Sequence, residues 1–136
     1  MPEMLEKIEP IIKKYNLELL LYFGSYGTEF YHRESDIDIA FLSTENLAPE
    51  KKLSLLEDLI KYHKKSEIDL VDLRIAEPVL RYEIALHGRV IYEKEENLFE
   101  KYRLFYIKRF YELKPVIEEE IRRIGLSVKE VIGNAR

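Results

Sequence analysis

The order of hydrophobic and polar positions along the chain predicts strands that alternate with helices. Apolar residues at helical spacing predict a helix over residues 4–15, and an almost unbroken apolar run predicts a buried strand over Leu17–Phe23. In three later segments apolar residues follow one another or alternate with acids, as is typical of strands: Asp36–Leu42, Glu67–Leu73 and Val90–Tyr92.

Prolines and glycines delimit the helices between these strands. The predicted helices over residues 49–63 and 78–88 each begin with a proline, and the second ends with a glycine. A long helix is predicted over residues 95–113, where Pro115 either kinks it or begins a new helix that reaches Gly125. This order of elements places the chain in the α/β or α+β class, as one small mixed β-sheet flanked by helices, with a long C-terminal helix.

Composition and charge exclude several classes of protein. The chain has 136 residues, enough for one domain, and has no cysteine, which rules out disulfides, thiolate nucleophiles and cysteine-ligated metals. Its first residues lack the pattern of a secretory signal and its most apolar stretch, Leu19–Phe23, is short, so we expect no membrane span and a cytoplasmic location. With 26 acids against 22 Lys and Arg, we expect no stable binding of duplex nucleic acid.

Aspartate is rare in this chain and concentrated where the pattern predicts strands. The sequence has 21 Glu but only five Asp, and four of the five lie in two short apolar runs: Asp36, Asp38, Asp69 and Asp72. Aspartate is disfavoured in strands and costly to bury. Its placement there calls for a chemical reason.

The first two of these acids have the spacing of a paired carboxylate site. In a strand Asp36 and Asp38 project from the same face, about 6.6 Å apart along the chain. Two ionised carboxylates this close repel each other unless one takes up a proton or a divalent cation neutralises them. Mg²⁺ is the favoured interpretation, because it prefers carboxylate oxygens and shares its coordination shell with substrate phosphates. A solvated strand end is the alternative for an Asp-x-Asp pair taken alone.

The turn before this strand indicates phosphate chemistry. Gly24 and Ser25 end the first strand, where a glycine lets backbone N–H groups approach an oxyanion and the serine hydroxyl adds another donor. A Gly-Ser pair alone is only a turn. Ten residues later come Asp36 and Asp38, and a further strand carries Asp69, which together make a far more specific arrangement.

These motifs carry a resemblance to a known family. Phe23–Gly27 followed by Ser35–Ile39 resembles the Gly-Ser-x10-Asp-x-Asp signature of the nucleotidyltransferase (polymerase β-like) superfamily, and the short chain resembles its minimal nucleotidyltransferase (MNT) branch. Glu67–Leu73 resembles the third-strand motif, and Leu80–Tyr92 resembles the segment that usually follows it. The similarity covers roughly residues 10–92 and implies the nucleotidyltransferase fold.

The resemblance implies transfer of AMP from ATP to a hydroxyl, with pyrophosphate leaving. Asp36, Asp38 and Asp69 are then the catalytic acids and the metal ligands, holding Mg²⁺, with two ions expected and Mn²⁺ as an alternative. Asp69 would also help to deprotonate the incoming hydroxyl. Asp72 lies an odd number of residues from Asp69, so a regular strand turns it to the other face, and we expect a structural role for it.

The resemblance also assigns the nucleotide to the Gly-Ser turn. Gly24 and Ser25 would hold the triphosphate. Family members often continue this turn with a small residue, a base and a second glycine, whereas this chain has Thr28–Glu29 after Gly27. An acid near a triphosphate is unfavourable, so either Arg33 supplies the missing positive charge or the turn binds nucleotide weakly. The departure therefore bears on nucleotide affinity more than on metal binding.

The MNT resemblance further implies a partner. Such proteins form the antitoxin half of HEPN/MNT toxin–antitoxin pairs and adenylylate a tyrosine of the HEPN toxin. A binding antitoxin without catalysis, or an enzyme acting on a small molecule, are the alternatives. Arg81 and His87 fit the loose Arg-x(4–6)-His pattern of HEPN nucleases, but the predicted strands argue against that all-helical domain.

The C-terminal helix has more aromatic residues than one buried stripe needs. We expect residues 1–94 to form the nucleotidyltransferase core and residues 95–136 to form a helical extension packed on the same domain. Aromatic and aliphatic residues of the segment 98–113 cover more than one stripe of the helix, so we expect a partner or homo-oligomer contact there. Tyr102 and Tyr106 are the expected exposed pair; tyrosines that simply face water are the alternative.

Overall fold

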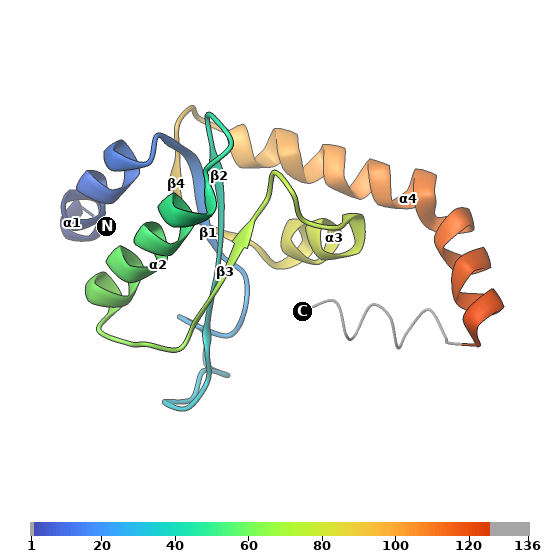
Figure 1. Cartoon of the computed structure of the whole chain (residues 1–136), viewed down its shortest axis with the longest axis horizontal. Coiled ribbons are helices and arrows are strands. Elements are labelled where there is room, and N and C mark those ends of the chain that lie inside the picture. Colours follow the sequence, from blue (N-terminus) through green and yellow to red (C-terminus); the bar gives the residue numbers. More distant parts are fainter. Residues whose placement is uncertain (1, 126–136) are drawn as a thin grey trace.

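The protein folds around one mixed four-stranded sheet. The computed structural model describes the backbone of residues 2–125 and the side chains of residues 7–125. The strands are β1 (Leu17–Tyr22), β2 (Ile37–Ser43), β3 (Ile68–Asp72) and β4 (Arg89–Glu93), in the spatial order β3-β2-β1-β4 (Figure 1). β1 pairs antiparallel with β2 and β4, and β2 pairs parallel with β3. The predicted mixed sheet is confirmed.

Two pairs of helices cover the two faces of this sheet. α1 (Pro2–Lys14) and α2 (Pro49–His63) lie on one side, and α3 (Pro78–His87) and α4 (Leu98–Ile124) lie on the other (Figure 1). α2 and α3 both begin with proline, which has no N–H to leave unpaired in the first turn. The sequence placed these helices within a few residues of their observed bounds.

The alternation of side chains along β2 divides the core into two layers. Ile37, Ile39 and Phe41 are buried toward α1 and α2, whereas Ala40 and Leu42 are buried toward α3 and α4. β1 has apolar side chains on both faces, because it lies in the middle of the sheet. Each face of the sheet therefore has its own apolar cluster.

The C-terminal helix corrects one sequence prediction and resolves another. α4 continues through Pro115 as a single helix, and its axis bends in the C-terminal half (Figure 1). Tyr106 is buried at 5% exposure and Tyr102 is partly buried, so the expectation that they form an exposed pair is wrong. Both pack in the core layer between the sheet and helices α3 and α4, because the face of α4 that carries them is turned toward α3. None of the helices within residues 2–125 combines the length and the apolar character needed to cross a membrane.

Candidate active site

Two of the acids predicted from the sequence lie in register on neighbouring strands, and the third directly precedes one of these strands. Asp38 on β2 is the direct register partner of Asp69 on β3, and Asp36 immediately precedes β2. Because parallel neighbours in register project from the same face, and strands are about 4.8 Å apart, the carboxylates of Asp38 and Asp69 are adjacent on the face covered by α3. Asp36 and Asp69 are exposed to solvent, and Asp38 is partly buried.

Gly24 brings the turn after β1 into contact with this acid set. A Cβ atom at position 24 would lie 1.8 Å from Oδ2 and 2.7 Å from Cγ of Asp38, far inside van der Waals contact. The Asp38 carboxylate therefore rests against the bare Cα of Gly24, and the backbone N–H of Phe23 donates to the Asp38 carbonyl at 3.1 Å. A side chain is excluded at position 24 because an acid occupies its space.

The segment after Gly24 is a series of turns. The Thr28 N–H and hydroxyl both donate to the Ser25 carbonyl, at 2.9 and 2.6 Å, and Gly27 has a φ of +83° that favours glycine. Glu29 is exposed and does not line the pocket beside the turn. The departure at Thr28–Glu29 thus supplies a hydroxyl that supports the turn and an acid that lies outside it.

A shallow pocket lies beside the turn and contains a cation that the sequence analysis missed. Its volume is about 330 Å³, and it is lined by Phe23, Gly24, Ser25, Thr28, Phe30, His87 and Arg89. Arg89 is the first residue of β4, opposite Tyr22 at the end of β1. Only the pairing of β4 with β1 brings Arg89 here, so spacing along the chain carried no signal for it.

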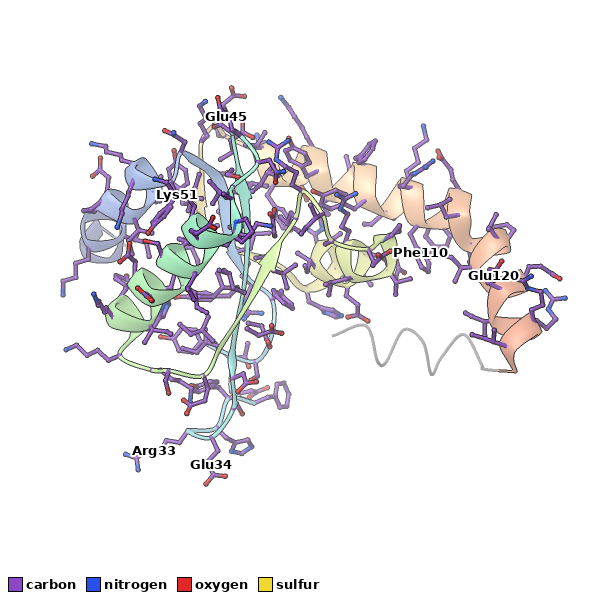
Figure 2. The ribbon with its side chains drawn as sticks, viewed as in Figure 1. Arg33, Glu34, Glu45, Lys51, Phe110 and Glu120 are labelled. Atoms are coloured by element: carbon purple, nitrogen blue, oxygen red, sulfur yellow. The ribbon has the colours of Figure 1, made fainter. Side chains whose placement is uncertain are left out.

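The structure does not bring Arg33 to the turn. Arg33 is exposed at the tip of the loop between β1 and β2 (Figure 2) and is not among the residues that line the pocket. Its carbonyl accepts a hydrogen bond of 2.5 Å from the Lys65 ammonium, which ties the loop to the segment before β3. The positive charge at the turn comes from Arg89 in this structure.

Asp72 lies on the opposite face of the sheet from Asp69, as the odd spacing predicts. It is 7% exposed, and its Oδ2 lies 2.9 Å from the Lys52 ammonium of α2. Its Oδ1 accepts a hydrogen bond of 3.0 Å from the backbone N–H of Arg74. These contacts tie β3 to α2 and to the following turn, which is a structural arrangement.

A cluster of aromatic side chains packs beneath the turn, on the face covered by α2. Tyr26 meets Tyr22 and Tyr31 edge to face, with ring centroids 4.8 and 5.1 Å apart. The Tyr22 hydroxyl lies 2.7 Å from Nε2 of His63, whose Nδ1 lies 2.9 Å from the Leu59 carbonyl. A carbonyl can only accept, so Nδ1 carries the proton and Nε2 accepts from Tyr22. Burial lowers the pKa of His63 and raises that of Tyr22.

The acids suit a Mg²⁺ ion that is coordinated partly by the protein and partly by the phosphates of a substrate. Within the described residues no three His, Asp or Glu side chains converge as a ready-made metal site. Mg²⁺ is usually held by one or two carboxylates together with waters and substrate phosphates, so a complete protein cage is not required. The in-register acids Asp38 and Asp69 would provide the hard oxygen donors for this kind of site, and Asp36 lies two residues before Asp38.

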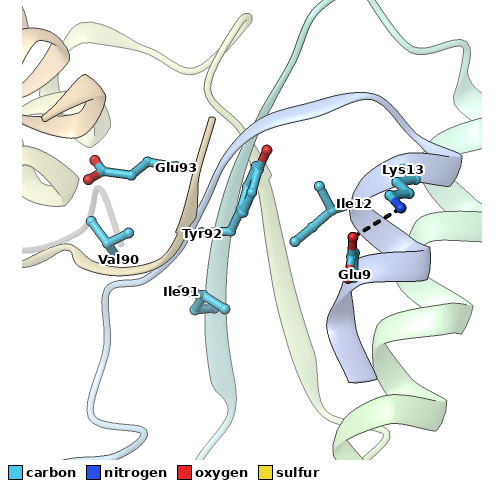
Figure 3. A pocket seen from close by; sticks show the side chains of 7 residues that line it. All are labelled: Glu9, Ile12, Lys13, Val90, Ile91, Tyr92 and Glu93. Atoms are coloured by element: carbon cyan, nitrogen blue, oxygen red, sulfur yellow. Dashed lines mark ion pairs between the residues drawn. The ribbon is translucent and has the colours of Figure 1, made fainter. Parts of the chain in front are cut away.

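A larger pocket lies elsewhere and contains none of these groups. Its volume is about 500 Å³, and it lies between α1 and the edge strand β4 (Figure 3). Ile12, Ile91 and Tyr92 form its apolar part, and Glu9 and Lys13 pair at 3.0 Å along α1. It lacks both paired acids and a glycine turn, so the smaller pocket beside Gly24 is the better candidate for phosphate chemistry.

A mixed sheet with adjacent acids on neighbouring strands, beside a glycine-serine turn, defines the class of nucleotide-transferring enzymes that the sequence suggested. The family model described as "Polymerase beta, Nucleotidyltransferase" matches residues 6–97. The chain belongs to this family, and the family predicted from the sequence is confirmed.

The chain is also similar to individual proteins and solved structures. The chain is 36% identical over 85 residues to a protein adenylyltransferase, MntA, of Shewanella oneidensis, and the matched region spans 61% of this chain but only 60% of that relative. A chain in a crystal structure of a toxin–antitoxin with AMP-PNP is 28% identical with a TM-score of 0.72, covering 93% of this chain and 97% of that one. A chain in the complex of tri-AMPylated S. oneidensis HEPN toxin with MNT antitoxin is 26% identical with a TM-score of 0.68, covering 96% and 98%.

Proposed function

We propose that this protein transfers AMP from ATP to a hydroxyl group, and that the acceptor is a tyrosine of a HEPN toxin for which it is the antitoxin. The observation that carries the proposal is the contact between Gly24 and Asp38, which joins the glycine turn to the acid set that includes Asp69. The relatives support the reaction and the partner, since one is a protein adenylyltransferase and others are toxin–antitoxin complexes with AMP-PNP or with AMPylated toxin.

The two halves of the site have separate tasks in this reaction. The turn at Gly24 and Ser25 holds the triphosphate through backbone N–H groups and the serine hydroxyl. Asp36, Asp38 and Asp69 are proposed to hold two Mg²⁺ ions, which supply charge neutralisation and orientation of the phosphates when bound. Mn²⁺ has the same preference for oxygen ligands and is a suitable substitute.

Asp69 is the residue best placed to serve the acceptor. It lies on the edge strand β3 and is exposed, whereas Asp38 is enclosed between β3 and the turn. Asp69 takes the proton of the incoming hydroxyl while the hydroxyl oxygen forms its bond to the α-phosphorus. The bond from the α-phosphorus to the bridging oxygen then breaks, and pyrophosphate leaves with the electron pair.

The comparison of Asp69 with Asp72 tests this assignment within one strand. We expect Asp69→Asn to lower single-turnover AMP transfer by a factor of about 100 or more while ATP binding remains, because a general base is lost. Asp72→Asn should leave the rate unchanged but lower the free energy of unfolding by about 1–3 kcal/mol, because it breaks a buried polar contact. The measurements are transfer from labelled ATP and urea unfolding. A dispensable Asp69 with an essential Asp72 would refute the assignment.

A second candidate function is neutralisation of the toxin by binding alone. The observation that favours it is a set of exposed apolar side chains on α4, described below, which catalysis does not use. A variant with Asp36, Asp38 and Asp69 all changed to Asn distinguishes the two functions. If it still protects cells from the toxin, binding is sufficient; if protection is lost while the complex still forms, catalysis is required.

Two further assignments belong to the same proposal. Arg33 is proposed as a nucleotide contact because it could supply the positive charge that the turn's own sequence lacks; it lies at the loop tip outside the pocket lining, so Arg33→Ala tests a contribution of charge and not of packing. Cytoplasmic location is proposed because the reaction consumes ATP, and the chain has no cysteine that an oxidising compartment would use.

A further inference from the structure

Arg89 contacts the backbone of the turn rather than another side chain. Its Nη2 donates to the Gly24 carbonyl at 2.6 Å and to the Tyr26 carbonyl at 2.7 Å, and its Nη1 donates to the His87 carbonyl at 3.3 Å. The first two contacts join residues 65 and 63 positions apart in the chain. A guanidinium at the start of β4 thus binds the turn that follows β1.

These contacts fix the orientation of two peptide units. No cis peptide bond occurs in the described part of the chain, so in each unit the C=O and N–H point in opposite directions. With the Gly24 and Tyr26 carbonyls turned toward Arg89, the N–H groups of Ser25 and Gly27 must point away from it. Neither N–H donates to another group within residues 2–125, whereas the Ser25 carbonyl is held by Thr28. The turn therefore has its carbonyls bound and two donors available.

The Nη2 atom of Arg89 is fully used by the turn, while two of the five N–H donors of the side chain, one on Nε and one on Nη1, are not used by these contacts. Each Nη atom has two protons, and both protons of Nη2 are used by the Gly24 and Tyr26 carbonyls. One proton of Nη1 is used by His87. The atom of Arg89 nearest the turn has no donor left for a ligand.

We propose that Arg89 is a positioning residue that holds the Gly24–Tyr26 carbonyls so that the Ser25 and Gly27 N–H groups are oriented in advance for a triphosphate. The inference rests on the proposed function, because it takes the turn as the triphosphate site. Orientation in advance strengthens binding because the loop does not have to be ordered when the nucleotide binds. Arg89 acts here through the backbone and does not touch the reacting atoms.

The chain offers a matched control in Arg74. Its Nη2 also donates to two backbone carbonyls, Ser43 at 2.8 Å and Thr44 at 2.7 Å. These carbonyls lie at the opposite end of β2 from Asp36 and Asp38. Arg74→Ala therefore removes the same kind of contact as Arg89→Ala without touching the turn.

The first measurement is made on the nucleotide-free full chain. In Arg89→Ala we expect the ¹⁵N order parameters of Ser25 and Gly27 to fall to flexible values, below about 0.6, while Arg74→Ala keeps them at wild-type values. The second measurement is calorimetric titration with AMP-PNP and Mg²⁺ below the melting temperature. We expect Arg89→Ala to weaken binding by about tenfold or more and Arg74→Ala to leave it unchanged.

A charge-preserving variant separates positioning from simple attraction. Arg89→Lys keeps the positive charge but has a shorter stem and no planar fork, so we expect a loosened turn and weaker nucleotide binding. It also serves as the test if Arg89→Ala does not fold. A loosened turn in Arg89→Lys with wild-type affinity would overturn the inference, because charge alone would then be sufficient.

The remaining outcomes separate this inference from the proposed function. Unchanged order parameters at Ser25 and Gly27 in Arg89→Ala would overturn the inference even if the wild type binds AMP-PNP. A wild-type protein that fails to bind AMP-PNP, with a turn that loosens in Arg89→Ala, would instead overturn the proposed function. In that case the result would still show that Arg89 orders the turn.

Discussion

The site depends most closely on the fit between two residues, Gly24 and Asp38. The carboxylate of Asp38 occupies the space in which any other residue at position 24 would place its Cβ. Asp38 thereby contacts the turn on one side, and it has Asp69 as its register partner on the other. Glycine is needed at position 24 to admit the Asp38 carboxylate, and not for a left-handed backbone, since only Gly27 and Gly125 are glycines with positive φ in the described chain.

Gly24→Ala should therefore damage the site more than the fold. The new methyl group forces the Asp38 carboxylate to rotate, which we expect to lower single-turnover AMP transfer by a factor of about 100. Overpacking at one position should cost about 1–3 kcal/mol in the free energy of unfolding. Asp72→Asn is the control, with a comparable loss of stability and no loss of rate. A Gly24→Ala protein with wild-type transfer would show that the observed position of Asp38 is not required.

At the scale of elements, a hydrogen bond ties the strand that leads into the turn to α2. The Tyr22 hydroxyl at the end of β1 donates to His63 in the last turn of α2, and Tyr26 packs against both rings. The His63 imidazole is held neutral here because its burial lowers its pKa. The element that supports the turn is therefore sensitive to acid.

We expect the free energy of unfolding to fall as the pH drops below about 6.5, the ordinary pKa of histidine. The unfolded state takes up a proton on His63 more readily than the folded state, so stability present above that pH is lost toward the lower folded pKa. Urea unfolding at pH 7.5 and 5.5 measures the change, and His63→Gln should reduce it. His32→Gln is the control, because His32 is exposed. In that variant the free energy of unfolding should still be lower at pH 5.5 than at pH 7.5 by the wild-type amount. The same loss of unfolding free energy between pH 7.5 and pH 5.5 in both variants would contradict the assignment to His63.

At the scale of the whole molecule, α4 both completes the core and presents a separate surface. Phe99, Tyr106 and Phe110 are buried, and the Tyr82 ring of α3 stacks on Phe110 with centroids 3.9 Å apart. Four large apolar side chains of α4 before its last turn are exposed instead: Leu104, Phe105, Tyr111 and Val116. We propose that the C-terminal segment predicted over residues 95–136 extends the core predicted over residues 1–94; residue 1 and residues 126–136 of these two ranges lie outside the described part of the chain. We also propose that the exposed part of 98–113 contacts the toxin or a second copy.

Replacing the exposed pair Leu104 and Phe105 with Ser should weaken association while leaving nucleotide binding intact. If either residue is a hot spot of the interface, its truncation should cost about 2 kcal/mol or more of binding free energy. Ile75→Ser is the control, because Ile75 is 64% exposed but lies in the segment between β3 and α3. The measurements are light scattering of the chain alone and calorimetric titration with the toxin. Unchanged mass and unchanged toxin affinity in the double variant would refute a contact through these two residues.

The sequence by itself determined the elements and the identity of the acids, because both follow from local rules. Alternation in a strand turned Asp72 away from Asp69, whereas the predicted common face of Asp36 and Asp38 stays a prediction because β2 begins only at Ile37. Prolines and glycines marked the helix ends within a few residues. These features depend only on neighbours along the chain.

Tertiary structure alone decided what lies beside what. The parallel register of β3 on β2 placed Asp69 next to Asp38, and the pairing of β4 with β1 brought Arg89 rather than Arg33 to the turn. It also chose which stripe of α4 is buried, because several of its faces are apolar and only packing on α3 distinguishes Tyr106 from Phe105. Contacts between strands and helices far apart in sequence are set by the packing of the whole core, which no local pattern encodes.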